Sequence, residues 1–192
     1  MALVLTSGPA LEPVTLAEAK AHLRVDSSAE DTLIASLIVT SRLHVEAALG
    51  LALITQSWSY FIDAWPPGAY VALPLRPIQS VAAVKLYAAD ESVEVLPAET
   101  WLLDGAGLPP RLVRRTALAW PPPRRPANGI EIALVAGFGD AAADVPAPIR
   151  QAVLLLLAHW YEHREPVEIG AAGAPVPPMV SELLRPYRSI RP

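Results

Sequence analysis

The chain has 192 residues, 53% of them hydrophobic and 18% charged, which is enough for one globular domain with a core and excludes global disorder. The formal net charge of −4 gives no reason to expect wholesale binding to nucleic acid or to an acidic membrane. Cysteine is absent, which excludes disulfides, thiolate metal sites and a thiol nucleophile.

The N-terminal part predicts two helices. Thr15 and Glu18 have capping-box spacing and open a short helix that ends near Leu23. A second capping box at residues 27–30 precedes apolar residues at helical spacing, and Gly50 is a natural stop. We therefore predict a second helix over residues 28–49.

The middle of the chain predicts short strands. Trp58, Tyr60 and Ile62 alternate with polar residues, as in a half-buried strand. Further strands separated by proline and glycine turns are predicted at residues 70–75, 81–87, 93–96, 101–103, 111–115 and 129–136.

Helical spacing returns after Pro146 and continues to about Arg164. Residues 165–178 are rich in Gly, Ala and Pro and predict a flexible connection, followed by a helical turn or two over 179–184 and a basic end.

These elements predict an α+β fold, an antiparallel helical bundle with an inserted, mostly antiparallel β-sheet of short strands. Its parts are residues 1–52 (N-terminal helices), 53–140 (β-rich insertion), 141–168 (C-terminal core helix) and 169–192 (flexible basic tail). The flanking helices each have one apolar face and should pack on each other. The expected helical core consists of Leu33, Leu37, Ile38, Val153, Leu156, Leu157 and Trp160.

No uncharged apolar run reaches the length of about 18 residues that a membrane span needs, and residues 1–12 lack a signal-peptide pattern. We expect a soluble product made in the cytoplasm, with no membrane partner.

A catalytic or metal site is weakly indicated. His159 and His163 are four residues apart on one helix face, but Glu162 is not in the zincin position, and further ligands would have to come from a loop. A metal-dependent hydrolase using this face remains an alternative. The other interpretation is a polar helix end whose His residues complement the helix dipole.

Five arginines cluster in the β-rich part: Arg111, Arg114, Arg115, Arg124 and Arg125. This cluster could contact nucleic acid, face an acidic protein surface, or be solvated. A DNA-binding module working through it is a further alternative.

Several segments resemble the head–tail connector (adaptor) proteins of long-tailed phages and phage-derived gene transfer agents. They are residues 14–25 and 30–38, then Arg42, Glu46, Gly50 and Thr55-Gln56, and later residues 145–152, 160–165, 176–177 and 183–188. The similarity runs in order along the whole chain.

The resemblance implies a structural role without enzyme activity or cofactor. Such proteins form a ring, typically of twelve subunits, under the portal protein. The ring continues the DNA channel, without sequence-specific binding, and presents a surface to the next tail component, a stopper or tail terminator. It also implies that the tail docks on the portal or a neighbouring subunit, through Leu184, Arg185, Tyr187, Arg188, Ile190 and Arg191.

Overall fold

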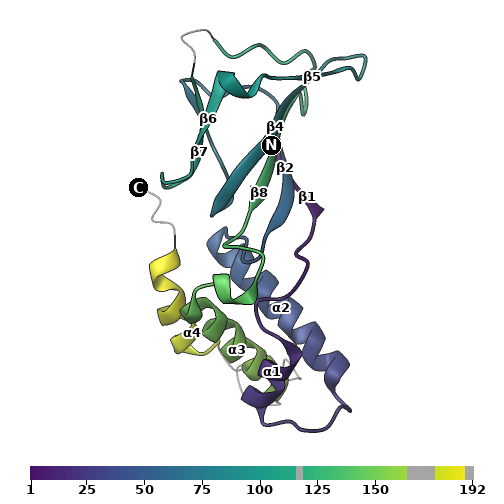
Figure 1. Ribbon diagram of the computed structural model, residues 1–192, viewed down its shortest axis with the longest axis vertical. Coiled ribbons are helices and arrows are strands. Elements are labelled where there is room, and N and C mark those ends of the chain that lie inside the picture. The colour runs from purple at the N-terminus through teal and green to yellow at the C-terminus, as the bar shows by residue number, and fades with distance from the viewer. Residues whose placement is uncertain (116–118, 164–175, 189–192) are drawn as a thin grey trace, which may run out of the picture. The chain divides into compact units, whose positions relative to one another are not determined.

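The computed structural model describes residues 1–115, 119–163 and 176–188 (Figure 1). The chain forms two compact units, each built from two separate stretches of sequence. Unit 1 consists of Met1–Ala10 and Gly50–Phe138, and unit 2 of Leu11–Leu49 and Gly139–Pro192. With helices and two antiparallel sheets in the described residues, the fold is α+β.

The larger sheet of unit 1 has five strands, and every neighbouring pair is antiparallel. In spatial order they are β1 (Ala2–Ser7), β2 (Gln56–Ile62), β8 (Ile130–Ala136), β4 (Ile78–Tyr87) and β5 (Val93–Val95). The central strand β8 alternates, so that Ile130, Ile132 and Leu134 are almost completely buried. This alternation defines the core face of the sheet.

A second sheet of three strands completes unit 1. Its order is β3 (Tyr70–Ala72), β7 (Arg111–Arg114) and β6 (Trp101–Asp104). Leu112 of β7 is fully buried in the same hydrophobic cluster as Ile130 and Ile132. The rings of Trp65 and Trp120 stack in the connecting loops, with centroids 4.3 Å apart. The two sheets therefore share one core.

Unit 2 is helical. Its helices are α1 (Leu16–Leu23), α2 (Asp31–Leu49), α3 (Ala147–Glu162) and α4 (Pro178–Leu184), with 3-10 turns at Ala142–Asp144 and Arg185–Tyr187. Helix α3 packs against the other three helices. The capping box of α1 is confirmed: the Glu18 N–H donates to Thr15 Oγ1 at 3.2 Å, and the Thr15 N–H donates to the Glu18 carboxylate at 2.8 Å.

The expected helical core residues differ in burial. Ile38, Val153, Leu156 and Leu157 are buried, whereas Leu33, Leu37 and Trp160 are half-buried. The rings of Trp160 and His44 form a T-shaped contact, with 5.5 Å between their centroids.

Several details differ from the sequence prediction. The capping box at residues 27–30 is wrong, because α2 begins at Asp31 and the Ser27 hydroxyl accepts from the Ala29 N–H instead. The single predicted sheet is two sheets. Residues 1–10, expected to belong with the N-terminal helices, provide strand β1 of unit 1. The sequence of β1 alone predicts a strand only weakly. The strand forms because it pairs with β2, which lies far along the chain.

The end of the chain is more structured than a flexible tail. Residues 178–184 form α4, which buries Val180 and Leu184. The predicted flexible connection lies largely outside the described residues, as do residues 189–192 of the basic end.

Helix α2 is long and apolar enough to cross a membrane by length and composition. The core helix of a soluble protein passes the same test, and α2 contains Arg42 and Glu46, which are both buried. The test therefore does not show a membrane span.

Candidate functional site

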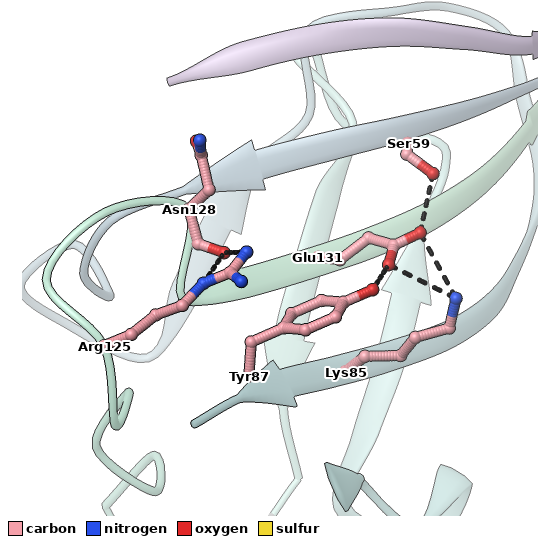
Figure 2. Close-up of polar contacts among 6 residues, drawn as sticks. All are labelled: Ser59, Lys85, Tyr87, Arg125, Asn128 and Glu131. Atoms are coloured by element: carbon pink, nitrogen blue, oxygen red, sulfur yellow. Dashed lines mark hydrogen bonds and ion pairs between the residues drawn. The ribbon is translucent and has the colours of Figure 1, made fainter. Parts of the chain in front are cut away.

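A buried carboxylate lies among polar side chains on the larger sheet (Figure 2). Glu131 of β8 is 5% exposed. It accepts hydrogen bonds from the Ser59 hydroxyl of β2 at 2.6 Å and from the Tyr87 hydroxyl of β4, and Lys85 of β4 lies 3.2 Å away as its ion-pair partner. Antiparallel pairing puts Lys85 directly opposite Glu131, so the sheet register brings the charges together.

The pKa shifts in this network favour a structural role. Burial raises the pKa of Glu131, but the hydrogen bonds from Ser59, Tyr87 and Lys85 outweigh it, and the pKa lies below its ordinary value. The hydrogen bond to Glu131 and burial raise the pKa of Tyr87 to about 12. A tyrosine general base or nucleophile would need the opposite shift. The network holds charges in place rather than activating them.

Three of the five clustered arginines are held by carboxylates. Arg111 pairs with Asp104 at 2.5 Å, Arg124 with Glu94 at 3.0 Å and Arg125 with Glu91 at 3.9 Å. The guanidinium of Arg125 also lies over the Tyr87 ring, 4.4 Å from its centroid.

The other two arginines differ in exposure. Arg114 has a buried Nε, whereas Arg115 is exposed. Arg111 and Arg114 lie on β7 of the smaller sheet, whereas Arg124 pairs with the β5 edge of the larger sheet. The described residues therefore do not form one unpaired positive surface.

The predicted contact residues of the C-terminal end also differ in exposure. Leu184 is 5% exposed and anchors α4, Tyr187 is half-buried, and Arg185 and Arg188 are exposed. Arg185 pairs with Glu182 at 3.5 Å. Ile190 and Arg191 lie outside the described residues. Among the predicted contact residues of this end that the structure describes, Arg185 and Arg188 are the exposed ones.

Unit 2 contains a buried ion cluster that connects the segment before α1 to α2. Arg42 donates to Glu12 and to Glu46, each at 2.7 Å, and only 6% of Arg42 is exposed. Burial lowers the pKa of Arg42, but the bonds to Glu12 and Glu46 outweigh it and raise the pKa above its ordinary value. Two of the three charged residues of α2, Arg42 and Glu46, are therefore buried.

The sequence and the fold were compared with known proteins. Residues 13–93 match the family described as phage gp6-like head-tail connector protein. No curated protein matches. A chain from the neck of an empty gene transfer agent (GTA) particle, computed with C6 symmetry, is 28% identical, with a TM-score of 0.85 over 100% of this chain and 97% of that chain.

Two further structures agree over the same shares of both chains. A chain from the virion of a native GTA particle is 29% identical with a TM-score of 0.85. A chain from the neck of a native GTA particle, computed with C12 symmetry, is 28% identical with a TM-score of 0.77. The chain is therefore similar to head–tail connector proteins over residues 13–93 and to GTA neck chains over its full length. The similarity to the neck structures extends the resemblance beyond the 81 residues of the family match.

The matching family and the structural neighbours are structural proteins of phage-like particles and not enzymes, which supports a structural connector subunit. The hydrolase and DNA-binding alternatives are not supported. His159 and His163 do lie together, with ring centroids 4.7 Å apart and His163 Nδ1 2.9 Å from the His159 carbonyl oxygen. However, the described part of the chain holds no group of three or more His, Cys, Asp or Glu residues that could bind a metal.

Sequence reasoning missed the two polar clusters of this protein. The pairing of Lys85 with Glu131 follows from strand register, which separates them by 46 positions in sequence. Arg42 and Glu46 are four apart on a predicted helix, which is a usable ion-pair signal. Their burial could not be predicted from that spacing, because exposed pairs have the same one.

Proposed function

We propose that this connector protein is a structural subunit of the neck of a phage-like particle, where it joins the capsid to the tail. The subunits form a ring under the portal protein and continue the channel through which DNA passes. The observation that carries this proposal is the similarity to GTA neck chains over the full length of this chain. The particle is of the gene transfer agent or tailed-phage type.

We further propose that the ring contains twelve copies. The similar neck structures were computed with C6 and with C12 symmetry. A twelvefold ring also has sixfold symmetry, so one ring size is compatible with both. Each copy then makes the same head-to-tail contact with the next, because only such a contact propagates around a closed ring.

The helices of unit 2 are proposed to act as an antiparallel bundle that forms the rigid body of the subunit. Helix α3 packs against α1, α2 and α4, which supports this role. The β-rich unit 1 is proposed to provide contacts to the next tail component, a stopper or tail terminator.

The C-terminal end is proposed to contact the portal or a neighbouring copy. Its exposed cations Arg185 and Arg188 carry this proposal, with Ile190 and Arg191 following them in sequence. Arg115 and Arg124 are exposed and are proposed to face either an acidic surface of a neighbour or the DNA channel.

A deletion tests the neck function. In a producing strain that lacks this protein, we expect filled heads and separate tails in electron micrographs, and a plasmid copy should restore joined particles. Mass spectrometry of purified necks should find the protein. Joined particles in the deletion strain, or necks without the protein, would exclude this function.

A further inference from the structure

Helix α2 has an unusual distribution of charge. A helix on the surface of a soluble protein normally buries its apolar side chains and presents charged ones to solvent. In α2 the reverse holds for Arg42 and Glu46, which are 6% and 9% exposed. Its remaining charged residue, Asp31, lies at the N-terminal end and pairs with Lys20 at 2.6 Å.

The outer face of α2 carries no carboxylate, ammonium or guanidinium group. It consists of two adjacent rows at four-residue spacing, Ala35, Val39, Leu43 and Ala47 in one row and Ser36 and Thr40 in the other, all of them exposed. His44, the next residue of the second row, packs against Trp160 of α3 and bounds the face. Val39 is 36% and Leu43 51% exposed. Residues at four-residue spacing form the ridges by which helices pack together.

The hydroxyl groups on this face already have partners within the helix. Ser36 Oγ donates to the Leu33 carbonyl oxygen and Thr40 Oγ1 to the Ser36 carbonyl oxygen, both at 2.8 Å. Burying a polar group costs free energy chiefly when its hydrogen bond is lost. Covering the outer face of α2 would break neither of these bonds, so the face can be removed from water at low cost.

We propose that the outer face of α2 docks against a second copy of this chain in the ring, chiefly through the row of Ala35, Val39, Leu43 and Ala47. The inference rests on the proposed neck function. The relatives that share this fold over its full length occur in necks with sixfold and twelvefold symmetry, so flanking copies are the neighbours that every subunit has.

The side chains of this face favour a second copy of the chain over DNA or a lipid surface as the binding partner. DNA and anionic lipid headgroups are bound chiefly through Lys and Arg, and this face has neither. A neutral ridge of small and aliphatic side chains fits an apolar surface of similar packing density, as in subunit interfaces. The α2 face is therefore one half of the heterologous contact that the ring requires, and its counterpart is a different surface of the next copy.

Site-specific photo-crosslinking tests the occupant. A photoreactive benzoylphenylalanine replaces Leu43 in the full chain, and particles from the complemented deletion strain are irradiated. We expect dimers and higher multiples of this chain, with cross-linked peptides that join position 43 to a different segment of a second copy. The chain has no cysteine, so disulfides cannot contribute to such a ladder.

Three results would overturn the inference and leave the neck function intact: a link from position 43 to another protein, a link between two positions 43, or no link in necks that contain the protein. A link between two positions 43 indicates a twofold contact, which cannot propagate around a ring. Binding of the purified chain to neutral phospholipid vesicles through α2 would also overturn it. If purified necks lack the protein, that result would contradict both the proposed function and this inference.

A charge variant supplies a second readout. Leu43→Asp should leave the melting temperature of the isolated chain unchanged, because the side chain is exposed, and reduce joined particles by about tenfold or more, because the contact would bury an unpaired charge. The matched control is Leu108→Asp, at a leucine of unit 1 that is 77% exposed. This variant should give the normal number of joined particles. Normal joining by Leu43→Asp, or an equal loss in the control, would refute the assignment.

Discussion

At the residue scale, the hydrogen bond from Tyr87 to Glu131 should contribute measurably to stability. Tyr87→Phe removes a donor from a buried, ionised acceptor, and such bonds are typically worth about 1.5 to 3 kcal/mol. We expect the free energy of unfolding in urea to fall by about 1.5 kcal/mol. Glu94→Gln, which breaks an exposed ion pair with Arg124, should change it by about 0.5 kcal/mol or less. Equal effects of the two variants would show that Tyr87 does not hold Glu131 in solution.

Glu131 should also make stability depend on acid pH. Its pKa in the folded protein lies below its ordinary value of about 4.3, so the unfolded chain takes up the proton first as the pH falls. The stabilisation is therefore present above about pH 4.3 and is lost as the pH falls through the lower folded pKa.

Urea unfolding at a series of pH values tests this sign. The stability difference between the natural chain and Glu131→Gln should be largest near neutral pH and shrink below about pH 4.3. Ser59, Lys85 and Tyr87 stay in place in both proteins, which makes the glutamine variant a matched control. A difference that grows toward acid pH would mean that burial, and not the three donors, sets the pKa of Glu131.

At the scale of elements, α3 should provide much of the stability of unit 2. Leu156 is fully buried, so Leu156→Ala should lower the free energy of unfolding by about 2 to 5 kcal/mol. Leu43→Ala, at a leucine that is 51% exposed, should cost about 0.5 kcal/mol or less in the isolated chain. Denaturant titration measures both. A loss of less than about 0.5 kcal/mol for Leu156→Ala would show that this side of α3 is not core.

Local sequence signals predicted the helices well and the sheets less well. Thr15 with Glu18 fixes the start of α1, because a capping box acts within one turn. Strand β1 depends on pairing with β2, about 50 to 60 positions away, and its own sequence carries little alternation. The division into two sheets likewise depends on β3 pairing with β7 across about 40 residues. Pairings over such distances are not encoded in local periodicity.

The interaction surfaces were predictable only in part. Residue type selected Arg185 and Arg188, which are exposed and stay candidates. It also selected Arg111 and Arg125, which are paired with Asp104 and Glu91. The outer face of α2 escaped notice because its apolar and small residues resemble those of a core. Only the exposure of these residues in the folded chain distinguishes a proposed docking ridge from a ridge buried in the core.

At the scale of the whole molecule, the anchoring of α4 determines how the C-terminal end can be tested. Val180 and Leu184 are 3% and 5% exposed, so deletion of all of α4 would uncover the apolar surface of α3. Loss of function in such a deletion would not separate unfolding from a lost contact. The informative changes are those beyond the buried residues, at Arg185 and Arg188.

Reversal of these two charges should therefore prevent joining without unfolding the subunit. The ion pair of Arg185 with Glu182 is 3.5 Å long, and both side chains are more than 60% exposed, so its loss should cost about 0.5 kcal/mol or less. We expect Arg185→Glu with Arg188→Glu to keep the melting temperature and to yield heads without a bound connector, because cations at a rim chiefly steer association and exclude wrong partners. Arg185→Lys with Arg188→Lys keeps both charges and should join normally. Electron micrographs and the protein composition of purified heads measure the outcome. Heads that carry the connector but lack tails would place this end against the tail component, and normal particles from the reversed variant would remove it from the interface altogether.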